Sequence, residues 1–235
     1  MTPETASGRI DLNRVRGLLF DVDGTLSDTD DHMVQQLARF LAPISGMFKG
    51  NDPRGFSRRL VMFSETPMNI AYNLADRIGL DAVIAGLYNW LTQKYSDQDE
   101  GADDFRLIPG IKEMLAGLSG AYPMAVVSAR DAHSTLRFLE HFDLLPYFET
   151  IVTSQTCRHT KPFPDPVEYA AAQLGLSPDA CLMIGDTIVD VRAGQAAGAQ
   201  TVAVLCGFGT QRELRRAGAD LILSSTQDLL SVFQS

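Results

Sequence analysis

Short apolar runs that end at polar residues recur along this chain, and longer segments with apolar residues at helical spacing lie between them. A short, continuously apolar run is typical of a strand that is buried on both faces of a parallel sheet. The strands predicted in this way cover residues 18–20, 124–127, about 150–153, 181–184, 201–205 and 219–223. The predicted helices cover about 110–119, 132–142, 188–197 and 226–233. Strands that alternate with helices predict an α/β fold with a parallel sheet and right-handed crossovers.

Two helix boundaries are marked by residue type. Asp165-Pro166-Val167-Glu168 is typical of a helix start, with Asp at the N-cap, Pro at the first helical position and Glu at the third. Gly198 is expected to end the helix that begins near residue 188, because glycine readily adopts the left-handed conformation that follows many helices.

The segment between the first strand and residue 106 has a different pattern. Apolar residues recur there every fourth position, which is the stripe of an amphipathic helix. The three stripes are Met33, Leu37 and Leu41; Ile70, Leu74 and Ile78; and Val83, Leu87 and Leu91. The segment has no convincing strand. We therefore expect a three-layer, Rossmann-like α/β core formed by residues 1–28 and 107–235, with an all-helical domain inserted at 29–106.

Composition narrows the classes of partner. The chain has 235 residues, of which 45% are hydrophobic and 21% charged, as in soluble globular proteins. A net charge of −9 argues against a nucleic-acid surface, and no apolar run is long enough to span a bilayer. Residues 1–13 lack the apolar core of a signal peptide, and three cysteines imply no disulfide framework. We expect a cytoplasmic protein with no nucleic-acid or membrane partner.

Polar residues follow several of the predicted strands. The ends of adjacent parallel strands meet at one edge of a sheet, where open α/β folds place their ligands. The residues gathered there would be Asp21, Asp23, Ser128, Lys161, Asp186 and Asp190. Four carboxylates at close range raise one another's pKa values, and a divalent cation resolves that conflict. Oxygen ligands without a nearby His or Cys indicate Mg²⁺ rather than Zn²⁺.

Each of these residues also has an ordinary structural alternative. Ser128 could cap the helix that follows it, and Lys161 could be a solvated surface lysine. Asp186 could cap the next helix while Asp190 complements its dipole. Only the convergence of all of them at one sheet edge favours a functional site.

Four segments together resemble the motifs of the haloacid dehalogenase superfamily of hydrolases, and they occur in the same order. They are Asp21-Val22-Asp23-Gly24-Thr25, Ser128 after its strand, Lys161-Pro162, and Gly185-Asp186-Thr187-Ile188-Val189-Asp190. The similarity covers residues 16–25 and 108–225. A helical insertion after the first motif resembles the subgroup with a helical cap domain, which includes phosphoglycolate phosphatases. The loop at 161–166 and the Gly-Phe-Gly-Thr segment at 207–210 look most like that branch.

The resemblance implies roles for the two acids of the first motif and for the metal ligands. Asp21 would be the nucleophile that forms an aspartyl-phosphate, and Asp23 would be the general acid and then the general base. Mg²⁺ would be bound by Asp21, the backbone carbonyl of Asp23 and Asp186. Asp190 would complete the metal site by orienting a metal water or Lys161.

The resemblance also implies a phosphate cradle. Its members would be Gly24, Thr25, Ser128, Ala129 and Lys161. The implied reaction is hydrolysis of a small phosphorylated metabolite, similar to phosphoglycolate, by a Mg²⁺-dependent phosphatase. The enzyme would be a monomer or a homodimer.

Basic residues that could bind the organic part of the substrate lie in the insertion and beside Ser128. Lys49, Arg54, Arg58 and Arg59 form a short basic stretch in an acidic chain, and Arg130 is a further candidate. Any of these could bind a second anionic group on the substrate. The alternative for the stretch in the insertion is a solvated helix face.

Three other functions remain open from the sequence. One is a phosphosugar mutase of the same family. Another is a phosphonate hydrolase, which would need a lysine of the insertion, Lys49 or Lys94, to form a Schiff base. A phosphoacceptor signalling domain also combines acids, a hydroxyl and a lysine around Mg²⁺, but its sheet carries no large helical insertion after the first strand. Sustained turnover of a phosphate ester would distinguish a phosphatase from such a signalling domain.

Overall fold

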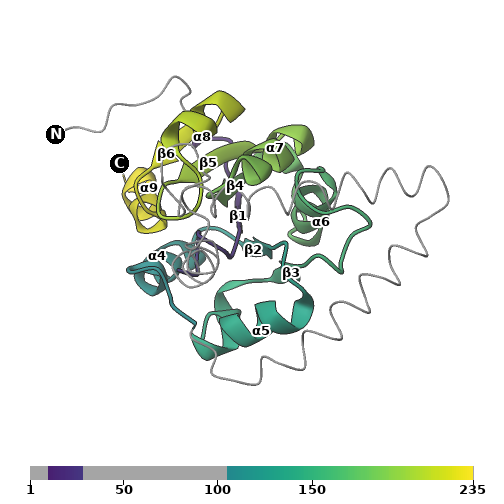
Figure 1. Ribbon diagram of the computed structural model, residues 1–235, viewed down its shortest axis with the longest axis vertical. Coiled ribbons are helices and arrows are strands. Elements are labelled where there is room, and N and C mark those ends of the chain that lie inside the picture. Colours follow the sequence, from purple (N-terminus) through teal and green to yellow (C-terminus); the bar gives the residue numbers. More distant parts are fainter. Residues whose placement is uncertain (1–9, 29–104, 235) are drawn as a thin grey trace, which may run out of the picture.

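The computed structural model describes residues 10–28 and 105–234, which form a parallel α/β sheet with helices on both faces (Figure 1). The strands are β1 (Gly17–Phe20), β2 (Met124–Val127), β3 (Thr150–Val152), β4 (Cys181–Gly185), β5 (Gln200–Val204) and β6 (Leu221–Leu223). The sheet order is β3-β2-β1-β4-β5-β6, and every neighbouring pair is parallel. All six strands predicted from the apolar runs are present, with boundaries within two residues.

The helices predicted for the core are all present, and Gln211–Ala217 is a further helix that the pattern did not predict. The helices are α4 (Ile111–Ser119), α5 (Ala132–His141), α6 (Asp165–Gln173), α7 (Ile188–Ala197), α8 (Gln211–Ala217) and α9 (Leu229–Phe233). Single 3₁₀ turns are η2 (Leu145–Tyr147), η3 (Pro178–Ala180) and η4 (Thr226–Asp228). The last predicted helix, 226–233, is thus divided into a 3₁₀ turn and a short α-helix. Gly198 ends α7 with a φ of 85°, as expected.

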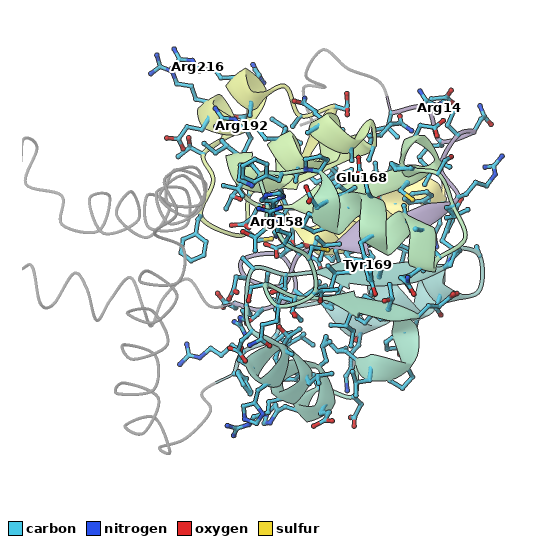
Figure 2. All side chains as sticks on the ribbon, turned by 90° about the vertical axis from the view of Figure 1, so that its right-hand side faces the viewer. Arg14, Arg158, Glu168, Tyr169, Arg192 and Arg216 are labelled. Atoms are coloured by element: carbon cyan, nitrogen blue, oxygen red, sulfur yellow. The ribbon has the colours of Figure 1, made fainter. Side chains whose placement is uncertain are left out.

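The residues of β1 alternate between two apolar layers. Leu18 and Phe20 pack in a cluster with residues of α4, α5 and α9, whereas Leu19 packs in a second cluster with residues of α6 and α7. Figure 1 shows α4 and α9 on one side of the sheet and α6 and α7 on the other. Glu168 and Tyr169 lie on the outer side of α6 (Figure 2). The described residues confirm the three-layer core.

The central position of β1 determines where the site forms. Phe20, its last residue, is opposite Val126 of β2 and Ile184 of β4. The loops that follow these three strands therefore leave the sheet at the same edge and next to one another. Asp21 continues the register, because its N–H donates to the carbonyl of Ile184 over 2.9 Å.

The chain leaves the core after β1 and returns to it at an adjacent point. The N–H of Asp28 donates to the carbonyl of Arg106 over 2.8 Å, and Ser27 forms an antiparallel bridge with Leu107. The N–H of Ile108 donates to the carbonyl of Leu26 over 3.0 Å. Of the predicted helical domain at 29–106, residues 29–104, including Lys49, lie outside the described residues.

The start of α6 differs by one position from the prediction. Pro164 is the N-cap and Asp165 is the first helical residue. The Asp165 carboxylate does not cap the helix, because its Oδ1 lies 2.9 Å from Nδ1 of His159 in the preceding loop. Pro164 O instead accepts the N–H groups of Val167 and Glu168.

Two further findings concern the cysteines and the helices. Cys157, Cys181 and Cys206 are free thiols. Among the described residues, every helix is too short or too polar to cross a bilayer.

Candidate active site

Asp21 lies directly after β1 and is almost completely buried, with 6% of its surface exposed. Its Oδ1 is 2.7 Å from the ammonium nitrogen of Lys161. Burial raises the pKa of Asp21 to about 8, because loss of solvation disfavours the charged carboxylate more than Lys161 favours it. The nearby acids Asp190 and Asp23 add to that shift. A bound cation would favour the ionised form of this carboxylate.

Lys161 joins two carboxylates inside the protein. Its side chain is 4% exposed, and Nζ lies 2.6 Å from Oδ1 of Asp190 as well as beside Asp21. Burial alone would lower the pKa of Lys161, but Asp190 and Asp21 raise it above its usual value. The alternative of a solvated surface lysine is therefore wrong, and Lys161 carries its charge within the site.

Asp190 both caps a helix and positions the lysine. Its Oδ2 accepts hydrogen bonds from the N–H and the hydroxyl of Thr187, over 3.0 and 2.7 Å, at the start of α7. Its other oxygen, Oδ1, pairs with Lys161. Thr187 is the N-cap of α7, so the alternative in which Asp186 caps this helix is wrong.

Asp186 follows β4 and is enclosed by glycines. Its Oδ2 accepts the N–H of Phe208 over 2.6 Å, and its carbonyl accepts the N–H of Gly209 over 3.1 Å. A Cβ on Gly207 or Gly24 would lie less than 3.0 Å from Oδ2 of Asp186, a distance that real Cβ atoms essentially never show. Gly24 also has a φ of 70°, which favours glycine. The loop 207–209 thus fixes the orientation of this carboxylate.

Three buried carboxylates form a group that fits a hard cation. Asp21, Asp186 and Asp190 each offer one oxygen, and these oxygens lie within 4.8 Å of one another. Lys161 adds one positive charge, so this group of four side chains has a net negative charge when all three acids are ionised. Carboxylate oxygens without a sulfur or imidazole ligand suit Mg²⁺ or a similar divalent ion.

Asp23 is paired with an arginine that follows β2. Nε of Arg130 donates to Oδ2 of Asp23 over 2.6 Å, and Nη2 donates to Oδ1, so the contact is bidentate. The guanidinium also lies 5.6 Å from the ring centroid of Phe138. The backbone N–H of Arg130 donates to Oγ of Ser128 over 3.1 Å. Arg130 is therefore held in place from several sides.

The proposed phosphate-binding residues occupy two different environments. Ser128 is buried at the end of β2 and does not cap α5, since Asp131 does so by accepting the N–H of Ser134. The N–H groups of Gly24 and Thr25 donate to Ser27 and Val22 within their own turn. Thr25 is fully buried. Gly24 and Thr25 thus lie in the turn that follows Asp23, and their role in phosphate binding stays a prediction.

A small pocket lies over the acids. Its lining residues are Asp21, Asp23, Ala129, Lys161, Asp186, Thr187 and Phe208. The lining thus combines both carboxylates of the first motif with the lysine. The sequence did not assign Thr187 or Phe208 to the site, although Phe208 lies in the Gly-Phe-Gly-Thr segment on which part of the family resemblance rests. Arg54, Arg58 and Arg59, the basic residues expected in the insertion, lie outside the described residues.

Comparisons with known proteins relate this chain to a family of hydrolases. Residues 18–204 match the family model described as haloacid dehalogenase-like hydrolase. A phosphoglycolate phosphatase of Nitrosococcus oceani is 31% identical over 223 residues, covering 88% of this chain and 92% of that protein. A pyrophosphatase PpaX of Oceanobacillus iheyensis is 27% identical over 219 residues, covering 93% and 96%.

A solved structure supports the fold independently. A protein of Clostridium acetobutylicum, described as a predicted phosphatase, superposes with a TM-score of 0.67. The match covers 94% of this chain and 98% of that one at 22% identity. This likeness concerns the fold alone.

Proposed function

Because the chain belongs to the haloacid dehalogenase-like hydrolases, we propose that it is a Mg²⁺-dependent phosphatase that acts through a phosphorylated Asp21. One observation carries the proposal: Asp21 and Lys161 are in contact inside a group of buried acids, beside a pocket that Asp23 also lines. That combination provides a nucleophile, a positive charge for phosphoryl oxygens and a group that can transfer protons.

The cation would be bound by Asp21, Asp186 and the backbone carbonyl of Asp23, with Asp190 holding Lys161 beside it. When bound, it would keep the carboxylates ionised and draw electron density from the transferred phosphoryl group. The remaining steps depend on the side chains of the chain itself.

In the first half-reaction, a carboxylate oxygen of Asp21 attacks phosphorus. A bond forms between that oxygen and phosphorus while the bond from phosphorus to the leaving oxygen breaks. Asp23 supplies a proton to the leaving oxygen. The ammonium of Lys161 and the hydroxyl of Ser128 stabilise negative charge on the phosphoryl oxygens.

In the second half-reaction, water attacks the phosphorus of the aspartyl-phosphate. Asp23 accepts a proton from that water, and the bond between Asp21 and phosphorus breaks. Inorganic phosphate leaves and the Asp21 carboxylate is restored. Asp23 thereby regains the proton that it gave to the leaving oxygen.

The proposed substrate is a small phosphorylated metabolite with an anionic leaving group. Relatives at 31% and 27% identity are named as a phosphoglycolate phosphatase and a pyrophosphatase, respectively. We propose that residues 29–106 form a helical cap that covers the substrate, and that residues 1–28 and 107–235 form the core. Three free thiols agree with the proposed location in a reducing cytoplasm.

The test is turnover of p-nitrophenyl phosphate and phosphoglycolate by the full chain with Mg²⁺, with EDTA and after Asp21→Asn. We expect sustained turnover with Mg²⁺ only, and loss of turnover in the Asn variant with its fold retained by circular dichroism. Undiminished activity of Asp21→Asn would exclude the covalent mechanism. A single burst without further turnover would instead indicate a phosphoacceptor domain.

A further inference from the structure

The guanidinium of Arg130 forms two hydrogen bonds with the carboxylate of Asp23. In the proposed function, Asp23 is the general acid and then the general base. The contact uses two parallel N–H groups, and the two side chains are 15% and 29% exposed. The pair of parallel N–H groups on a guanidinium fits the two oxygens of a carboxylate or a phosphate and binds either of them with two charge-assisted hydrogen bonds. In this contact, both carboxylate oxygens of Asp23 accept a hydrogen bond from Arg130.

Arg130 is placed to reach a bound substrate. Asp23 and Ala129, the residue before Arg130, both line the pocket. The backbone of Arg130 is fixed by the hydroxyl of Ser128, and its guanidinium lies near the buried ring of Phe138. The guanidinium contacts a residue of the pocket lining, Asp23, and a change of its side-chain rotamer could bring it to another anion in the pocket.

We propose that Arg130 binds the anionic leaving half of the substrate, a carboxylate or a second phosphate, by exchanging its contact with Asp23 for that group. The exchange frees the oxygens of Asp23, one of which can then take up a proton from water and deliver it to the leaving oxygen. When no substrate is bound, the carboxylate of Asp23 occupies the position on Arg130 that the anionic group of the substrate would take. This inference rests on the proposed function for its substrates. It adds a preference for substrates with an anionic leaving half, which the four motifs do not explain.

Three phosphate compounds separate this role from general phosphate binding. Phosphoglycolate has a carboxylate in its leaving half, pyrophosphate has a phosphate there, and ethyl phosphate has neither. All three present the same phosphoryl group to Asp21. An arginine that binds the leaving half affects the first two, whereas an arginine that binds the transferred phosphoryl group affects all three.

The experiment compares kcat and KM of the wild type, Arg130→Ala and Arg130→Lys on these compounds. We expect Arg130→Ala to lower kcat/KM about 10- to 100-fold for phosphoglycolate and pyrophosphate, the range for lost charge-assisted hydrogen bonds. Ethyl phosphate turnover should be unchanged or higher, because Asp23 is released. Arg130→Lys should recover only part of the loss, since an ammonium does not make the bidentate contact.

Arg216→Ala is the matched control. Arg216 is exposed on α8 and extends away from the core (Figure 2), so its loss removes the same charge without touching the pocket. It should leave all three kcat/KM values unchanged. An equal loss on ethyl phosphate in Arg130→Ala would overturn the inference. So would an unchanged preference for phosphoglycolate and pyrophosphate over ethyl phosphate.

A binding measurement distinguishes failure of this inference from failure of the proposed function. In an NMR titration of the wild type with glycolate or inorganic phosphate, the Arg130 Nε–H signal, assigned by its absence in Arg130→Lys, should shift. If no compound is hydrolysed but the signal shifts, the proposed function is wrong and the anion-binding role of Arg130 stands. If the compounds are hydrolysed and neither anion shifts the signal, the inference is wrong.

Discussion

The backbone of Gly207 lies so close to the side chain of Asp186 that a Cβ at that position would stand less than 3.0 Å from the carboxylate. The same carboxylate accepts the N–H of Phe208, the next residue along the chain. The carboxylate is thus held from one side by the backbone of a loop that follows β5. Precise orientation of a carboxylate is one of the main ways in which proteins tune a metal site.

Replacing Gly207 by alanine should therefore displace Asp186 and weaken cation binding. We expect Gly207→Ala to raise the dissociation constant for Mg²⁺ or Mn²⁺ about 10- to 100-fold, as for other changes that disturb ligand orientation. Calorimetry on the full chain measures this directly. Gly120→Ala is the control, because a Cβ on Gly120 meets nothing within 4 Å. Equal metal affinity in both variants would show that the loop does not position Asp186.

Removing the ammonium of Lys161 should destabilise the protein, because Asp21 and Asp190 would lose their buried positive partner. Breaking a buried ion pair costs about 3–5 kcal/mol, and we expect Lys161→Met in EDTA to lie near the lower end of that range. The reason is the raised pKa of Asp21, which allows this acid to take up a proton instead. Urea denaturation measures the free energy of unfolding.

Lys112→Met is the matched control for that experiment. Lys112 pairs with Asp143 at 3.3 Å on the surface, where both side chains are exposed. Surface pairs contribute about 0–1 kcal/mol, so this variant should remain close to the wild type. A loss of the same small size in both variants would contradict the buried arrangement of Lys161.

Asp131 should stabilise α5 in a pH-dependent way. Burial alone would raise the pKa of Asp131, but its hydrogen bonds with Ser134 and neighbouring N–H groups lower it below the usual value. An acid with a lowered pKa contributes stability above its unfolded pKa and loses that contribution as pH falls through the folded pKa. We expect Asp131→Ala to cost about 1 kcal/mol at neutral pH.

The difference between wild type and Asp131→Ala should shrink as pH falls below about 4, near the unfolded pKa of aspartate. Asp131→Asn retains a side-chain acceptor that does not titrate, so its stability should be closer to the wild type at neutral pH. Denaturation curves at several pH values test both statements. A gap that widens in acid would contradict the capping role.

Cys181 should resist alkylation in the folded protein. Its side chain is fully buried in β4, and burial, with a smaller effect of Asp179, raises the pKa of the thiol to about 11. Because the thiolate is the reactive form, iodoacetamide at pH 8 should modify the half-buried Cys157 before Cys181. Mass spectrometry of timed samples resolves the two sites. Equal rates would indicate that β4 opens readily.

The sheet could be predicted from the sequence because its strands are buried on both faces and are therefore continuously apolar. The convergence of Asp21 and Asp186 followed from parallel topology, since the ends of adjacent parallel strands must meet. Lys161 lies in the loop between β3 and α6, and β3 is not a neighbour of β1, so its place in the site was indicated only by the family resemblance. The contact between Arg130 and Asp23 could not be predicted, because it joins residues 107 positions apart through rotatable side chains. Nothing in the spacing of these two residues along the chain indicates a bidentate contact between the guanidinium and the carboxylate.

The cap of α6 and the position of Phe208 were missed for a related reason. Asp165 has the right residue type for an N-cap, but a longer-range partner, His159, takes its carboxylate. Phe208 contributes its backbone N–H, which every residue except proline possesses, so its residue type carries no signal. Competition between local and distant hydrogen bonds is decided by the folded structure.

The paired chain ends at Asp28 and Arg106 have a consequence for how such an enzyme can change over generations. The core requires only that the two ends of the intervening polypeptide, at Asp28 and Arg106, lie close enough to form a hydrogen bond. The entropic cost of closing such a loop grows slowly with its length, so substitutes of very different size are tolerated. If this segment covers the substrate as proposed, selection could exchange all of it, and with it the range of accepted metabolites, while the proposed reacting residues of the core stay in register.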